Sequence, residues 1–191
     1  TEIPVTGRFS LAGGNPKTPD FAKSPRGLAL QFKLPGDNLH HFTMLNIPIF
    51  GAANPQTFLN AAISNTPDPA TGKPDPAKQA EFRATHPDTK PLGEYMSKTN
   101  PPASYASSDF FSIHTFKVIN RDNQTTLVKW QFVPELGIKR LSDEQMTNSP
   151  VRFLDQDLLD QSNLRLLENA LGQGMLGQRQ KILSAAMATG I

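Results

Sequence analysis

The stretch HHFTMLNIPIF, residues 40–50, decides how the rest of the chain is interpreted. Its apolar residues predict a buried β-strand, and one amide side chain, Asn46, lies inside the apolar run. A short polar side chain in a core strand costs about 1–3 kcal/mol unless a partner satisfies it. Asn46 therefore predicts either a pocket that handles a small polar molecule or a side chain that caps a turn before Pro48.

Composition excludes several classes of protein. The chain has 191 residues and a formal net charge of +2, so it is long enough for one domain with a core, and its charge does not indicate a nucleic-acid groove or a membrane surface. No apolar run approaches the ~20 residues that a membrane span needs. The chain has no cysteine, which excludes disulfides, thiolate nucleophiles and zinc fingers, and fits an oxidising compartment or a protein that handles oxidants.

Turn residues divide the first part of the chain into an antiparallel meander and a helical region. Strands are expected at residues 5–11, 26–34 and 40–50. Helices are expected at residues 56–64 and 76–86, the first with Asn54 as N-cap, Pro55 at the first helical position and Phe58 on its buried side.

The second part is expected to add two strands and a helical end. The strands are predicted at residues 110–119 and 125–133. Ser142 and Gln145 form a capping-box pattern that predicts a short helix, and from residue 153 the pattern is helical almost to the end.

Few residues have the chemistry of a site. The sequence has no nucleophile elbow, P-loop or dinucleotide fingerprint. His40 and His41 point to opposite faces of a strand, so no protein-only metal site is expected, and His114 is interpreted as a satisfied core histidine. The remaining polar and aromatic candidates are Arg8, Ser10, Arg26, Asn46, Phe50 and Phe58. They suggest an aromatic-lined pocket for a flat ligand with anionic edges, and a haem with its two propionates would suit it. The alternative is that Arg8 and Arg26 are ordinary cations at the rim of a sheet.

Five motifs in order resemble those of the monofunctional haem catalases. They are PVTGRFSLAGG at residues 4–14, SPRGLALQF at 24–32, NIPIF at 46–50, HTFK at 114–117 and GIKRLS at 137–142. The loop DPATGKPD at residues 68–75 is most similar to the small branch of the family, the catalase-related peroxidases. The resemblance extends over residues 3–160.

The resemblance implies an α+β fold with an antiparallel β-barrel. Residues 1–150 would form this catalase-like domain, with a helical insertion at residues 54–97, and residues 151–191 would form a helical C-terminal segment. It also implies a buried haem b and the breakdown of hydrogen peroxide or organic peroxides, with a small-molecule reductant, in oxidative-stress defence.

Each candidate residue takes a role from the resemblance. Asn46 would orient the peroxide, and Ser10 would hydrogen-bond the distal histidine. Arg8 would pair with a haem propionate, and Arg26 would be structural or lie on the propionate side. The remaining three would surround the haem: Phe50 and Phe58 on the distal side, and His114 behind the proximal ligand.

Two family residues have no counterpart in this chain. The family places the distal histidine before the strand that contains Arg8, and the proximal tyrosine in a late helix, whereas the two tyrosines of this chain are Tyr95 and Tyr105. Because both groups are essential to the chemistry, we expect an excised piece or incomplete domain that is inactive or nearly so.

Other hypotheses stay open at this point. One alternative is a catalytically inactive barrel that serves as an interaction module through its helical tail, and another is a barrel that binds a different apolar ligand. Homo-oligomerisation is left open. The compartment is either periplasm or cytoplasm, with the periplasm preferred because the small branch is often exported.

Overall fold

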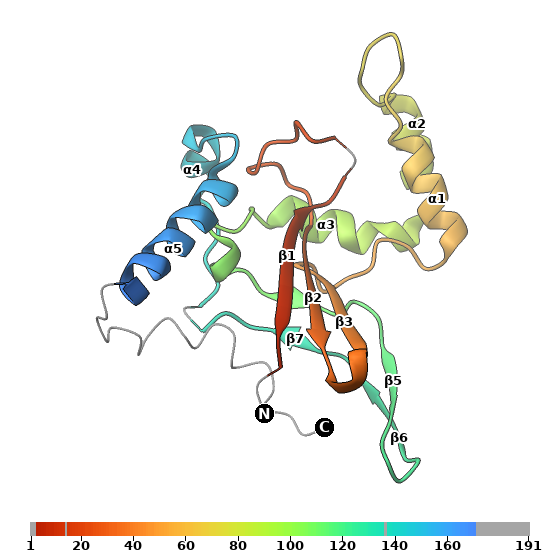
Figure 1. The fold of residues 1–191 in the computed structure, drawn as a ribbon. Coiled ribbons are helices and arrows are strands. Elements are labelled where there is room, and N and C mark those ends of the chain that lie inside the picture. Colours follow the sequence, from red (N-terminus) through yellow and green to blue (C-terminus); the bar gives the residue numbers. More distant parts are fainter. Residues whose placement is uncertain (1–2, 14, 136, 171–191) are drawn as a thin grey trace. The chain divides into compact units, whose positions relative to one another are not determined.

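The computed structural model describes residues 3–13, 15–135 and 137–170. These residues form both helices and strands, which confirms the expected α+β class (Figure 1). The chain divides into two compact units, one made of Thr1–Pro48 and Asn100–Ile191 and the other of Ile49–Thr99. Each unit is described by itself, and the expected domain boundary at residue 150 stays a prediction.

The first unit is built on a five-stranded antiparallel sheet with the strand order β1-β2-β3-β4-β7 (Figure 1). Its strands are β1 (Val5–Leu11), β2 (Arg26–Lys33), β3 (Leu39–Leu45), β4 (Phe110–Phe111) and β7 (Gln131–Phe132). The first three pair in sequence order, with the short 3-10 helix η1 (Pro35–Asp37) between β2 and β3, so the predicted meander is confirmed. Strand β3 ends earlier than expected, which puts Asn46 in the bend that follows it.

The expected β-barrel is not closed in the part of the chain that the structure describes. β1 and β7 are the edges of the sheet and do not pair with each other. β4 and β7 have two residues each, and the remaining strands, β5 (Phe116–Ile119) and β6 (Thr125–Val128), form a separate two-stranded sheet. In the described residues these strands therefore form an open sheet and a separate hairpin.

The long strands predicted at residues 110–119 and 125–133 are each interrupted, and the two interruptions face each other. The backbone N–H of Ser112 donates to the Trp130 carbonyl at 3.0 Å, and the Trp130 N–H donates to the Ser112 hydroxyl at 3.2 Å. Between β4 and β5, Ile113 has a φ of 50°, in the left-handed region that β-branched residues rarely adopt. The hairpin therefore leaves the five-stranded sheet at this point and continues as β5–β6.

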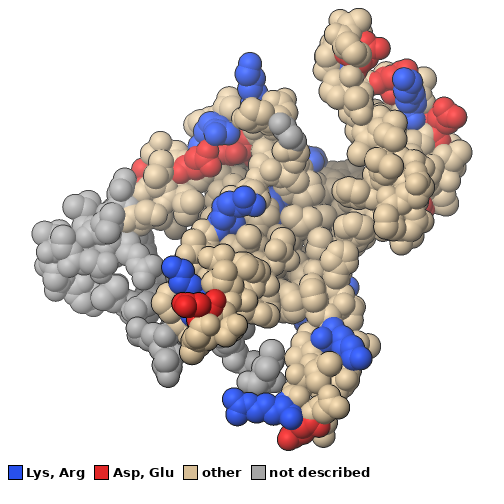
Figure 2. All heavy atoms as spheres, turned by 45° about the vertical axis from the view of Figure 1, so that its right-hand side comes forward, with Lys and Arg blue, Asp and Glu red and all other residues tan. Residues whose placement is uncertain are grey.

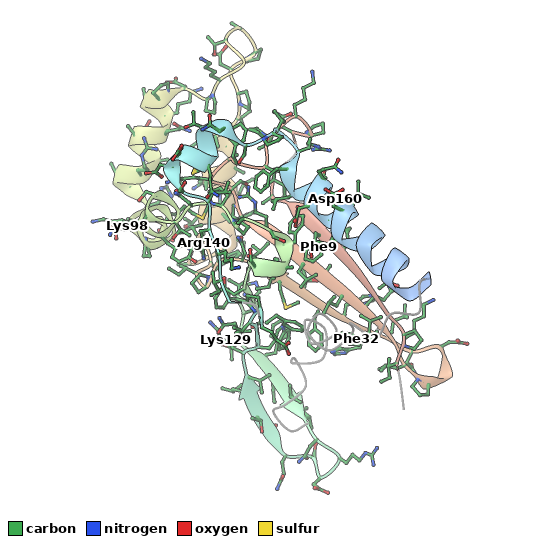
Figure 3. The ribbon with its side chains drawn as sticks, turned by 90° about the vertical axis from the view of Figure 1, so that its left-hand side faces the viewer. Phe9, Phe32, Lys98, Lys129, Arg140 and Asp160 are labelled. Atoms are coloured by element: carbon green, nitrogen blue, oxygen red, sulfur yellow. The ribbon has the colours of Figure 1, made fainter. Side chains whose placement is uncertain are left out.

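The core of this unit lies on one face of the meander. Buried residues Leu30 and Met44 from the sheet pack with Tyr105 of the 3-10 helix η3 (Tyr105–Ser107) and with two residues from later elements, Phe110 and Leu154. The Phe9 ring stacks on the Tyr105 ring with centroids 4.4 Å apart, and Figure 3 shows Phe9 on the side of the sheet where these elements lie.

The loop between β1 and β2 is tied to the start of helix α5 (Phe153–Ala170). The Asp20 N–H donates to the Val151 carbonyl at 2.8 Å, and the Asp20 carboxylate accepts from the Leu154 N–H at 2.9 Å. A carboxylate at a helix N-terminus satisfies a free N–H and interacts favourably with the helix dipole. The predicted helices beyond residue 170 lie outside the described residues.

The helix caps predicted at Asn54 and Ser142 are both present in the structure. Helix α4 (Asp143–Asn148) begins with both bonds of the Ser142–Gln145 capping box. In the second unit, Asn54 caps α1 (Pro55–Ser64) by accepting from the Thr57 N–H at 2.9 Å, and Asp75 caps α2 (Pro76–Thr85) by accepting from the Ala77 N–H at 2.8 Å. The 3-10 helix η2 (Pro87–Thr89) and α3 (Lys90–Lys98) complete this unit.

One expectation for the second unit is wrong. Phe58 does not lie on the buried side of α1, because its side chain is 56 % exposed, while Thr57 and Ser64 are the buried residues of that helix.

Among the described helices, none has the length and apolar character needed to cross a membrane.

Candidate functional site

Asn46 is held by the backbone of the neighbouring strand. Its Oδ1 accepts from the Arg26 N–H at 2.7 Å, and its own N–H donates to the Arg26 carbonyl at 2.9 Å. Asn46 is 5 % exposed, so these bonds offset the cost of burying an amide. No group among the described residues accepts from its Nδ2, which leaves this N–H₂ as a fixed and unused donor.

Ser10 and Arg8 lie on one face of β1, at the end of the sheet where Asn46 is found. Ser10 is opposite Gly27 of β2, which is opposite Leu45 of β3. A Cβ on Gly27 would lie 2.5 Å from the Ser10 Oγ, so any larger residue at this position would force the Ser10 hydroxyl to move. Arg8 is exposed and has no acidic partner among the residues that the structure describes.

Arg26 is buried and its guanidinium binds the backbone. Its Nη1 donates to the Ala22 carbonyl at 2.8 Å and to the Ser24 carbonyl, and its Nη2 donates to the Asp20 carbonyl. Burial lowers the pKa of Arg26, and the nearby Tyr105 and Asp20 side chains partly oppose this effect. These contacts shape the loop between β1 and β2, which favours the structural alternative for Arg26 over contact with a ligand.

His114 does not lie within a strand. It is exposed and sits in the bend between β4 and β5, next to Ile113. The buried Ser112 fixes this bend, since its hydroxyl donates to the His114 carbonyl at 3.1 Å. The expectation of a core histidine on the face shared with Ser112 is therefore wrong, because the interruption of the strand turns this segment out of the sheet.

Phe50 and Phe58 belong to the second unit and are in contact with each other. Their rings stack with centroids 5.8 Å apart and planes 15° apart, and the side chains are 39 % and 56 % exposed. Close packing fixes the chain after Phe50, because a Cβ on Gly51 would lie 2.7 Å from the Leu92 Cδ2. The pair presents a flat aromatic surface within its own unit.

The structure therefore gathers Arg8, Ser10, Arg26 and Asn46 at one end of the meander and places Phe50 beside Phe58 in the other unit. A catalase family model matches residues 1–164.

The chain belongs to the catalase family.

Relatives agree with this membership and with the resemblance seen in the sequence. The chain is 50% identical over 160 residues to a catalase-related peroxidase of Synechococcus elongatus, which covers 84% of this chain and 47% of that protein. It is 33% identical over 146 residues to a catalase of Listeria innocua, which covers 76% of this chain and 30% of that protein. The chain thus spans about half the length of the peroxidase and about a third of the catalase.

Solved structures agree in fold. A bacterial catalase superposes with a TM-score of 0.74 at 23% identity, covering 83% of this chain and 31% of that one. A fungal catalase gives a TM-score of 0.74 at 24% identity, covering 83% of this chain and 32% of that one. The open sheet of this catalase-family chain is therefore part of a known fold.

Two further sets of interacting side chains in this catalase-family chain were not predicted from the sequence. Gln31 and His41 are directly opposite each other on β2 and β3, and their side-chain nitrogens are 2.8 Å apart. Asp20 and Tyr105 lie beside the buried Arg26, and burial followed by the charge of Asp20 raises the pKa of Tyr105. The turn at residues 35–38 could have given the Gln31–His41 register, whereas the Arg26 cluster joins distant segments and has no local signal.

No cluster of three or more His, Cys, Asp or Glu side chains able to hold a metal occurs among the described residues.

Proposed function

We propose that this chain forms part of a haem-dependent peroxidase or catalase that breaks down hydrogen peroxide or organic peroxides in oxidative-stress defence. Family membership and the 50% identity to a catalase-related peroxidase support the reaction class. The observation that carries the proposal is the Asn46 amide, whose Oδ1 is occupied by the Arg26 N–H while its Nδ2 is free to donate. A fixed donor that is already oriented can bind a peroxide oxygen without a reorganisation cost.

Arg8 fits one part of a haem, because it is an exposed cation without an acidic partner among the described residues, as a propionate requires. Within the second unit, considered by itself, the stacked Phe50 and Phe58 offer a flat apolar surface. Tyr105 does not fit the iron, because it is 5 % exposed, stacks on Phe9 in the core and has a raised pKa, which disfavours a phenolate. Bound haem would supply the iron at which the peroxide O–O bond breaks.

This chain's own residues would then act as follows. The Asn46 Nδ2 would donate a hydrogen bond to a peroxide oxygen, and Arg8 would neutralise a carboxylate of the cofactor. Ser10, whose hydroxyl has no partner among the described residues, would bind the distal histidine of the family. A small-molecule reductant, assembly as a homo-oligomer and a periplasmic location belong to the same proposal.

A hemin titration of the 191-residue chain tests the proposal. We expect a saturable 1:1 shift of the Soret band and weak peroxide turnover. The matched variant is Asn46→Asp, which keeps an acceptor for the Arg26 N–H but removes the Nδ2 donor, so it should bind hemin and lose the turnover. Hemin binding no stronger than that of an unrelated protein would overturn the proposal, as would full turnover in Asn46→Asp.

A non-catalytic interaction module is the second candidate function. One observation favours it: α5 exposes two adjacent leucines, with Leu158 38 % and Leu159 57 % exposed. Apolar side chains on a helix surface are a common basis for helix docking. If the chain fails to bind hemin, this candidate predicts that Leu159→Glu abolishes association of the chain with itself in analytical ultracentrifugation.

A further inference from the structure

The solvent-facing side of the meander carries a second set of polar residues, one row beyond Arg8. In the register of the sheet, Arg8 is opposite Ala29 and Thr43, and the next row on the same face is Thr6, Gln31 and His41. Side chains from both rows line one open hollow on this face; they are Thr6, Arg8, Ala29, Gln31, His41 and Thr43.

The charges on this face are all of one sign. Alternate residues of β1, β2 and β3 point to the same side, and the charged residues on this side are Arg8 and Lys33, with no Asp or Glu. Over the whole face of the molecule in view in Figure 2, both basic and acidic side chains are present. A cationic face without acidic neighbours is complementary to an anionic ligand.

The contact between Gln31 and His41 leaves one N–H of the histidine ring available to donate a hydrogen bond. The Gln31 Nε2 lies 2.8 Å from the His41 Nε2, and an amide nitrogen can donate but not accept. The His41 Nε2 is then the acceptor of a neutral ring, and the ring proton is on Nδ1. The pair therefore fixes the ring and offers its Nδ1–H to a further acceptor, while the hydroxyl of Thr43 nearby has no partner among the described residues.

We propose that His41, oriented by Gln31, is a second carboxylate-binding group on this face, and that it takes one propionate of haem while Arg8 takes the other. The inference rests on the proposed function and extends it to residues that the family resemblance did not single out. Arg8 and His41 are two strands and one row apart, roughly 12 Å at their Cα atoms. Two separate anchors on one face match a ligand with two carboxylates on one edge.

The test compares hemin with hemin dimethyl ester, which has the same ring and iron but no carboxylates. Dissociation constants for both are measured from Soret titrations of the unmodified chain and of His41→Leu. We expect the unmodified chain to bind hemin more tightly than the diester. In His41→Leu the ratio of the two dissociation constants should fall about tenfold, which corresponds to one hydrogen bond to a charged group. Affinity for the diester should not change.

Two control variants make the result specific. His40→Leu replaces the adjacent exposed histidine, which contacts Phe42 on the opposite face, and should leave the preference for hemin unchanged. Gln31→Leu should reproduce part of the His41→Leu effect, because it removes the group that fixes the ring. Circular dichroism confirms that each variant is folded.

Each outcome is decisive. If the unmodified chain shows no saturable hemin binding, the proposed function is overturned and this inference with it. If hemin binds but His41→Leu keeps the unmodified preference over the diester, this inference alone is overturned. If succinate binds the haem-free chain in calorimetry as tightly as hemin does, and His41→Leu abolishes that binding, the face takes free carboxylates and the assignment to propionates is wrong.

Discussion

Asn46 has a structural role and a proposed functional role, and two substitutions separate them. In Asn46→Ala the Arg26 N–H loses its acceptor, and Arg26 is 1 % exposed, so water cannot easily replace it. An unsatisfied buried donor costs about 1–3 kcal/mol. For a chain of this size, a loss of about 2 kcal/mol lowers the thermal midpoint by roughly 4–8 °C. Asn46→Asp keeps the acceptor and should stay within about 1 kcal/mol of the unmodified chain.

The assay is urea unfolding followed by tryptophan fluorescence, with Trp130 as the reporter. Thr43→Val, an exposed substitution on β3 just before Asn46, is the control and should change the free energy of unfolding by less than about 0.5 kcal/mol. The reasoning is refuted if Asn46→Ala is as stable as Thr43→Val, or if Asn46→Asp is destabilised as much as Asn46→Ala. Neither result depends on hemin, so this measurement stands apart from the proposed function.

Three more predictions concern the core and the site. Leu154→Ala should lower the free energy of unfolding in urea by about 2–5 kcal/mol, because this fully buried side chain leaves a cavity; a loss below 1 kcal/mol would contradict the packing. Gly27→Val should destabilise the chain by colliding with the Ser10 hydroxyl, and in a double-mutant cycle Ser10→Gly should restore part of the loss; additive effects would show that the two do not touch. Burial raises the pKa of Tyr105, so the native chain keeps this proton while the unfolded chain releases it above about pH 10. Stability should therefore fall as pH rises through this range, and Tyr105→Phe should make that fall shallower in alkaline unfolding curves.

Local signals in the sequence predicted the elements whose stability is local. The caps predicted at Asn54 and Ser142 are confirmed, because each side chain accepts from a backbone N–H three residues further on. The meander was correct because turn residues separate its strands and alternate residues mark its faces. The same reasoning placed His40 and His41 on opposite sides of the sheet, as their different partners on β2 confirm.

Features that depend on distant segments could not be predicted. The interruption at Ser112 and Trp130 joins two apolar runs that look continuous, because nothing in either run shows that the other bends at the same place. Phe58 follows a helical apolar pattern and was expected to be buried, but pattern alone does not show what covers a helix face. At the site, the sequence proposed Asn46 for its polarity, while the bond to Arg26 that fixes it needed the register of two strands.

The contact between Asp20 and Leu154 has a consequence for the order of folding during synthesis. These residues are 134 positions apart, and Leu154 also fills the core against the meander. β3 ends at Leu45. At about 5–20 residues per second, the ribosome needs roughly 5–20 s to synthesise the chain from there to Leu154. During that interval the apolar face with Leu30 and Met44 lacks its last covering side chain, so binding to a ribosome-associated chaperone should be strongest for nascent chains that end between β3 and α5.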